Sequence, residues 1–216
     1  MNLQGKLIVV EGIDGAGTTT QIERYAAHLR QAKRLVHVTR EPSQGPIGSM
    51  LRQALGGRMA LGNGYHSELM ALLFAADRLD HLATEIEPWL RDGAVVLCDR
   101  YDLSSIAYQT ATAPAELLER VDFESWVRSL NRFARRPDLT VVVNVSPDLA
   151  ERRRRSRTGK PDIYEVAELQ RKLAALYRDA ERLTPGDAIV HIDGDPSLEE
   201  VSASLRAVLD PLVLGE

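Results

Sequence analysis

The chain has little cysteine and no long apolar run. Its 216 residues include one cysteine, Cys98, so an internal disulfide cannot form and a reducing cytoplasm is the expected location. No stretch reaches the ~18 consecutive apolar residues that a membrane-spanning helix requires. The opening MNLQGKLIVVEG has too short an apolar run, and no small-residue cleavage site, for a secretory signal. We therefore expect no membrane partner.

An excess of basic residues is also missing. The 27 lysines and arginines face 31 aspartates and glutamates, and the net charge of −4 argues against a general nucleic-acid coat protein. Any anion site must therefore be built locally. Hydrophobic residues make up 44% of the chain and charged residues 27%, a balance typical of a globular protein. The length fits a single domain over residues 1–216.

Short apolar runs rich in valine and isoleucine alternate with segments of helical periodicity. The runs are Leu7–Val10, Leu35–Val38, Ala94–Leu97, Thr140–Val145 and Ala188–Ile192. Runs of this length without polar alternation are typical of strands buried on both faces. The alternation predicts an α/β fold, a five-stranded parallel sheet with helices on both faces.

Three of the helices can be placed more closely. The spacing of apolar residues predicts a long helix over Ser67–Leu90. Ser146-Pro147-Asp148 has the pattern of a helix start, with a capping hydroxyl and a proline in the first turn. Asp195-Pro196 has the same pattern, so a final helix is expected from there through about Leu209.

A glycine-rich loop follows the first apolar run and precedes a helical run over Thr20–Leu29. A phosphate loop (P-loop) reads G-x-x-x-x-G-K-[ST] in this strand–loop–helix context, and its backbone N–H groups surround phosphate oxygens. The residues predicted to bind ATP are Gly12, Ile13, Asp14, Gly15, Ala16, Gly17, Thr18, Thr19 and Thr20. Thr19 occupies the hydroxyl position that coordinates Mg²⁺ in such loops.

The lysine of the P-loop pattern is replaced by Thr18. A charge-assisted hydrogen bond contributes roughly 1.5–3 kcal/mol, and loss of one preorganised transition-state donor costs about 10²–10³ in rate. Thr18 can donate one neutral hydrogen bond but carries no charge. Either another cation reaches the phosphates, or the protein is a weak enzyme or none.

Three further motifs follow the loop along the chain. They are TREPSQGPIGSMLRQ from Thr39, LFAADR from Leu73 and DRYDLSSIAYQ from Asp99. Together with EGIDGAGTTTQ, they resemble the thymidylate kinase (dTMP kinase) family over the full chain. The resemblance implies a P-loop NTPase-type fold and transfer of the ATP γ-phosphoryl group to dTMP, with Mg²⁺, to give dTDP. It also implies a homodimer to which the long helix contributes.

The resemblance assigns roles to residues whose chemistry suits them. Arg40 and Arg100 follow strands, where an open α/β sheet places its ligands, and the family arginines at these positions contact the acceptor phosphate. Asp14 resembles the family carboxylate that contacts the acceptor's sugar hydroxyl. Asp99 is an acidic partner for Mg²⁺ or its waters. The remaining residues expected to bind dTMP are Phe74, Arg78, Ser105, Tyr108 and Gln109.

Phe74 and Arg78 are four residues apart and therefore share a helix face. Such an aromatic residue is more often part of the core than a platform for a base. The resemblance favours thymine binding for this pair. The family aromatic residue at the position of Tyr108 lies where a 2′-hydroxyl would go.

An arginine-rich stretch, Arg152–Arg155 with Arg157 and Lys160, falls where the family has its mobile lid, at about residues 147–165. Gly15 matches the family branch in which lid arginines supply catalytic charge. We expect Arg153, Arg157 or Lys160 to take over the role of the missing lysine, since a cis arginine can contribute on the order of 10³-fold. Ile163 occupies the arginine position of the family's D-R-x-E lid pattern. The expected catalytic residues are Asp14, Arg100, Arg153 and Arg157.

Other functions fit less well. A nucleotide-binding pseudokinase would explain Thr18, but the expected acceptor-site residues are all present. A phosphotransferase for another acceptor, such as dUMP or a deoxynucleoside, stays open. A GTPase is disfavoured because no N-K-x-D segment is present, and a metal hydrolase because the five histidines are scattered without ligand spacing.

Overall fold

A computed structural model of the chain describes residues 5–59, 61, 65–156 and 166–215. Its centre is a five-stranded, all-parallel sheet with the strand order β2-β3-β1-β4-β5. The strands are β1 (Lys6–Glu11), β2 (Val36–Arg40), β3 (Val95–Asp99), β4 (Leu139–Asn144) and β5 (Ile189–Asp193). The predicted α/β fold is confirmed. The inner strands are almost wholly buried, whereas the edge strands β2 and β5 are half-buried, because one side of each has no neighbouring strand.

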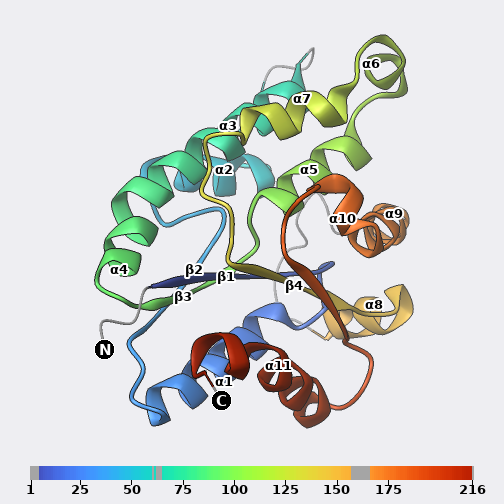
Figure 1. Cartoon of the computed structure of the whole chain (residues 1–216). Helices are drawn as coiled ribbons and strands as arrows, with labels where there is room; N and C mark the ends of the chain where they lie inside the picture. Colours follow the sequence, from blue (N-terminus) through green and yellow to red (C-terminus); the bar gives the residue numbers. More distant parts are fainter. Residues whose placement is uncertain (1–4, 60, 62–64, 157–165, 216) are drawn as a thin grey trace.

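Helices cover both faces of the sheet. Figure 1 shows α1 (Thr18–Gln31) and α11 (Leu198–Val213) on one face, with α2 (Pro46–Leu55), α3 (His66–His81), α5 (Asp102–Thr112) and α7 (Phe123–Leu130) on the other. The remaining helices are α4 (Glu87–Arg91), α6 (Ala115–Arg120), α8 (Pro147–Arg155), α9 (Ala167–Arg178) and α10 (Ala180–Leu183). Within the described ranges, no helix is both long and apolar enough to cross a membrane.

The long predicted helix is present, although it is not α-helical throughout. A π-helical segment, η1 (Leu82–Ile86), connects α3 to α4, so helical structure runs from His66 to Arg91. The apolar spacing identified the helical span but not its π-helical segment, whose i→i+5 hydrogen bonds a 3.6-residue period does not reveal.

Helix α8 begins where the sequence predicts, but without the predicted hydroxyl cap, and the predicted start of the last helix is wrong. Ser146 is the N-cap residue of α8, but its hydroxyl makes no capping hydrogen bond. The last helix is capped by Ser197 and not by Asp195, because Ser197 and Glu200 form a reciprocal capping box. The carboxylate of Asp195 instead accepts from the backbone N–H of Ser146 at 2.7 Å. This helix also continues to Val213, beyond the predicted end near Leu209.

The parallel strands bring the predicted site residues to one edge of the sheet. Arg40, at the end of β2, is paired in register with Asp99 at the end of β3, and Asp99 is paired with Val10 of β1. The glycine-rich loop follows directly after β1. Because the carboxyl ends of these three adjacent strands coincide, the loop, the arginine and the carboxylate face one crevice.

Candidate functional site

The loop after β1 has the backbone of a phosphate loop. Gly15 and Gly17 have φ angles of +93° and +88°, a region that glycine adopts without strain. Gly17 is the N-cap residue of α1, so the positive end of that helix faces the loop. A pocket opens here, which we call the phosphate-loop pocket. It is lined by Ile13, Asp14, Gly15, Gly17, Thr18, Thr19, Arg40, Glu41, Asp99 and Arg100.

A second pocket adjoins the first and lies between α3 and α5. This α3–α5 pocket is lined by Asp14, Glu41, Pro42, Leu55, Phe74, Arg78, Arg100, Tyr101, Ser104, Ser105, Tyr108 and Gln109. It brings together every residue expected to bind dTMP except Arg40, which lines the phosphate-loop pocket. Asp14, Glu41 and Arg100 line both pockets, so a group bound in one meets a group bound in the other at these side chains.

Asp14 and Arg100 form an ion pair where the pockets meet. Nη2 of Arg100 lies 2.6 Å from Oδ1 of Asp14. Oδ2 of Asp14 accepts from the Tyr108 hydroxyl at 3.1 Å and from Nε2 of Gln170 at 2.8 Å. The Arg100 guanidinium also lies 5.2 Å from the centre of the Tyr108 ring. Three of the predicted residues, Asp14, Arg100 and Tyr108, are therefore held by contacts with one another.

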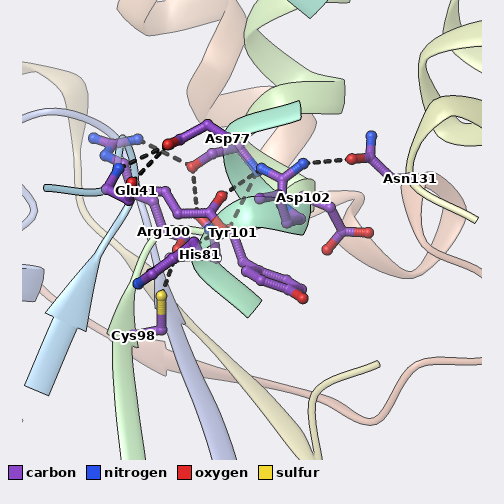
Figure 2. A network of polar contacts seen from close by, with 12 residues as sticks. Glu41, Asp77, His81, Cys98, Arg100, Tyr101, Asp102 and Asn131 are labelled. Carbon is purple, nitrogen blue, oxygen red and sulfur yellow. Dashed lines mark hydrogen bonds and ion pairs between the residues drawn. The ribbon is translucent and has the colours of Figure 1, made fainter. Parts of the chain in front are cut away.

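Arg78 is a buried cation at the end of the α3–α5 pocket, with 1% of its surface exposed. Its Nη2 pairs with Oε2 of Glu41 at 2.6 Å, and its Nη1 donates to the side chain of Asn131 (Figure 2). The guanidinium lies 5.0 Å from the centre of the Tyr101 ring. Burial alone would lower the pKa of Arg78, but the Glu41 carboxylate reverses that effect and raises it. Glu41 thus keeps this arginine charged inside the protein.

Phe74 belongs both to the core and to the α3–α5 pocket, the two roles that its sequence position allowed. It packs against the main hydrophobic core and also lines the α3–α5 pocket beside Arg78. The side chain is half-buried, so one part supports the core and another part is available to a ligand.

Several buried polar atoms of the α3–α5 pocket have no hydrogen-bond partner among the described residues. They are Oγ of Ser105 and both side-chain heteroatoms of Gln109, which is fully buried. A buried polar group left without a partner costs about 1–3 kcal/mol, so native proteins rarely keep one without a ligand or water to complete it. These atoms point to a polar ligand.

The two residues predicted to hold a metal are in contact. The Thr19 hydroxyl donates to Oδ2 of Asp99, while Oδ1 of Asp99 is buried without a partner among the described residues. Within the described ranges no three His, Cys, Asp or Glu side chains cluster as a metal site. One carboxylate and one hydroxyl fit Mg²⁺, which completes its octahedron with water and substrate phosphates.

Helix α8 lies against the outer side of the phosphate loop. A Cβ atom on Gly15 would stand 2.5 Å from the backbone oxygen of Ala150. Arg153 donates to the backbone oxygen of Ala16 at 3.5 Å and to that of Gly194 at 3.2 Å. The structure thus places Arg153 on the backbone of the loop. The predicted residues Arg157 and Lys160 lie outside the described residues.

Sequence reasoning missed other residues that contact the loop. Arg154 is buried and donates to the backbone oxygen of Asp14. Gln170 is fully buried, and its Oε1 accepts from the backbone N–H of Asp14 at 3.0 Å. The one available signal for Arg154 was its position four residues after Ala150, on the same helix face.

Comparison with known proteins gives one family. A family model described as "Thymidylate kinase" matches residues 10–205. A protein of Pyrobaculum aerophilum named "Probable thymidylate kinase" is 37% identical over 209 residues, covering 95% of this chain and 97% of its own length. Proteins of the same name from Thermococcus kodakarensis (37% identical, 97% and 98% covered) and Pyrobaculum calidifontis (38%, 94% and 95%) are similarly close.

Proposed function

Because the chain belongs to the thymidylate kinase family, we propose that it transfers the γ-phosphoryl group of ATP to dTMP, giving dTDP and ADP. The observation that carries this proposal is the junction of the two pockets at Asp14 and Arg100. ATP phosphates in the phosphate-loop pocket and a nucleoside monophosphate in the α3–α5 pocket would meet there.

The reaction needs positioning and charge stabilisation more than covalent help from the protein. An oxygen of the dTMP phosphate attacks the γ-phosphorus, and the bond from the γ-phosphorus to the oxygen bridging it to the β-phosphate breaks as that oxygen leaves with ADP. Arg40 and Arg100 line the phosphate-loop pocket and would hold the acceptor phosphate there. Backbone N–H groups of the loop would hold the donor phosphates. Thr19 and Asp99 would hold Mg²⁺, which neutralises phosphate charge when bound.

Recognition of the base falls to the α3–α5 pocket. Phe74 offers an apolar surface for the pyrimidine, and the buried Arg78 offers a donor to an exocyclic oxygen. The buried atoms of Ser105 and Gln109 that have no partner in the described part of the chain would form hydrogen bonds with the nucleotide. Tyr108, whose hydroxyl donates to the carboxylate of Asp14, would contact the sugar.

The charge of the missing lysine has to come from elsewhere. Thr18 lines the phosphate-loop pocket in the lysine position. The candidates for the replacement are Arg153, Arg157 and Lys160, and for Arg153 a contact of its guanidinium with the Ala16 carbonyl of the loop supports the proposal. Reorientation of that side chain toward bound ATP would supply the positive charge.

The proposal extends to assembly and location. Leu69, Leu72 and Leu79 lie on α3 and are 36%, 46% and 41% exposed, respectively, which favours a homodimer that covers this helix. We also propose one kinase domain over residues 1–216, a cytoplasmic location and no nucleic-acid partner, in keeping with the single cysteine and the net charge of −4.

The test is steady-state formation of diphosphates from ATP and Mg²⁺ with dTMP, dUMP, dCMP, dGMP and UMP as acceptors. We expect preferential turnover of dTMP, at roughly 1–100 s⁻¹ by analogy with other kinases. Arg40→Ala should weaken use of dTMP, whereas the control Arg91→Ala, an exposed arginine on α4, should not. Binding of dTMP without phosphorylation of any acceptor would favour the pseudokinase alternative.

A further inference from the structure

Glu11 is a buried acid that the proposed reaction does not use. It is the last residue of β1, directly before the phosphate loop, and its side chain is fully buried. Oε1 accepts from the backbone N–H groups of Tyr101 at 2.8 Å and Ser104 at 3.2 Å. Oε2 accepts from the hydroxyls of Ser104 at 2.5 Å and Tyr177 at 3.3 Å. Four donors thus converge on one carboxylate.

This carboxylate caps α5 from a neighbouring strand. The N-cap residue of α5, Tyr101, provides no side-chain cap of its own. The first N–H groups of a helix lack intrahelical partners, and a negative charge at this end is favourable. Glu11 therefore joins α5, which carries Ser105 and Gln109 into the α3–α5 pocket, to the strand that leads into the phosphate loop.

The two hydroxyls that bond to Glu11 also hold Arg100. Nη1 of Arg100 donates to Oγ of Ser104 and to the Tyr177 oxygen, each at 3.2 Å, and these two oxygens are 2.7 Å apart. The backbone of Arg100 has a φ angle of +71°, which is disfavoured for a residue with a side chain. Surrounding contacts maintain this conformation. Glu11 contributes to them by accepting hydrogen bonds from the two hydroxyls that contact Arg100.

We propose that Glu11 is a positioning residue for Arg100: its carboxylate orders the hydroxyls of Ser104 and Tyr177, which hold the guanidinium where the two pockets meet. This inference rests on the proposed function, because it takes Arg100 as a group that holds the acceptor phosphate. The negative charge contributes as well as the hydrogen bonds, since it offsets part of the cost of burying the Arg100 cation.

The ionisation of Glu11 provides a specific signature. Burial raises its pKa from 4.5 to about 7, against the hydrogen bonds it accepts and the charge of Arg100. The other titratable groups that interact with Glu11 are the Cys98 thiol of β3 and the Tyr177 phenol of α9; Tyr101 contacts it only through its backbone N–H. Burial also raises the pKa of both groups, so neither of them ionises near neutral pH. Between pH 6 and 8, Glu11 is the group in this set that changes charge.

The test compares wild type with Glu11→Gln, which keeps the size of the side chain and removes the charge. The kcat/KM for dTMP is measured from pH 5.5 to 9. Near pH 8 we expect the variant to be slower by about 10²-fold, the cost of misplacing a catalytic group by roughly 1 Å. The ratio of wild type to variant should fall toward 1 below pH 6, because a protonated Glu11 resembles the amide. Ionisation of the dTMP phosphate affects both proteins and cancels in this ratio.

Further variants separate positioning from support of the fold. If Glu11 acts through the Ser104 hydroxyl, Glu11→Gln combined with Ser104→Ala should lose little more than the more damaging single change. Tyr177→Phe removes only the second hydroxyl and should also lower kcat/KM, which keeps the test available if Glu11→Gln does not fold. The matched control is Glu124→Gln on α7, a partly exposed carboxylate bonded to Arg128 that lines neither pocket, which should leave kcat/KM unchanged.

The outcomes distinguish this inference from the proposed function. The positioning role would be overturned if the ratio of kcat/KM between wild type and Glu11→Gln did not vary with pH. It would also be overturned if the losses of the two single variants added fully in the double variant. In both cases an active wild-type protein would leave the proposed function intact. A wild-type protein that phosphorylates no acceptor would overturn the proposed function and this inference with it.

Discussion

Gly15 and Gly17 provide a matched pair of substitutions for testing how α8 is attached to the phosphate loop. Both have left-handed backbones, with φ of +93° and +88°. A Cβ atom on Gly17 would have no neighbour within 4 Å, whereas one on Gly15 would stand 2.5 Å from the backbone oxygen of Ala150 in α8. Gly15→Ala and Gly17→Ala therefore share the backbone strain, and only the first adds a collision with α8.

The expected costs follow from these two terms. An alanine in a left-handed conformation costs roughly 1–2 kcal/mol, so Gly17→Ala should lower the free energy of unfolding by about that amount. In Gly15→Ala the Cβ must move from 2.5 Å to the 3.4 Å of ordinary contact, and the obstacle is backbone. Overpacking of this kind adds about 1–3 kcal/mol. The total for Gly15→Ala is about 2–5 kcal/mol.

The collision should also have a functional effect, because α8 carries Arg153 and Arg154 to the carbonyls of Ala16 and Asp14. Urea unfolding gives the stability difference, and steady-state assays give kcat and the KM for ATP. We expect Gly15→Ala to lower both stability and kcat more than Gly17→Ala does. Equal losses of stability in the two variants would show that α8 does not press on the loop at this point, and would refute the reasoning.

Three other changes test separate parts of the site. Gln109→Leu removes two buried polar atoms that lack partners among the described residues and should weaken dTMP binding by roughly 10-fold or more in calorimetry, whereas the exposed control Gln53→Leu should not. Burial raises the pKa of Glu11 from 4.5 to about 7, so its contribution to stability is present below pH 4.5 and is lost as the pH rises to 7, by up to about 3 kcal/mol. In urea unfolding, the free energy of unfolding of Glu11→Gln should therefore not fall with pH over this range as it does in the wild type. The same fall in the variant would contradict the assignment. Alanine at Arg153 or Arg157 should lower kcat by about 10²–10³ at whichever residue replaces the lysine, and no effect at either position would exclude both.

The sheet and the loop could be predicted because their signals are local in the sequence. A run such as Leu7–Val10 is recognisable as a buried strand without knowledge of its neighbours, and the glycine spacing identifies the turn that follows. Parallel pairing then brings Arg40 and Asp99 to the same edge, since the ends of adjacent strands coincide. The wrong start of α11 and the missing hydroxyl cap of α8 arose because several nearby polar residues compete for one capping position, and only the folded backbone selects among them.

The supporting residues could not be predicted, because their partners are far away in the sequence. Gln170 binds Asp14 across 156 positions, and Glu11 binds Ser104 across 93. Neither residue belongs to a pattern that specifies such a partner. A fully buried glutamine or glutamate departs from the preference of these residues for the surface, and burial is known only once the chain is folded.

Loss of the P-loop lysine has a structural counterpart in the side chains that surround Asp14. Its backbone N–H binds Gln170, its backbone oxygen binds Arg154, and its carboxylate binds Arg100. Arg154 belongs to the arginine-rich stretch and lies on α8, which ends at Arg155, whereas Gln170 lies on α9, which begins at Ala167. A cation delivered from that stretch would therefore act on a loop whose geometry the same two helices already determine. The positive charge that a lysine provides in the P-loop pattern can therefore come from α8 or from the residues that follow it.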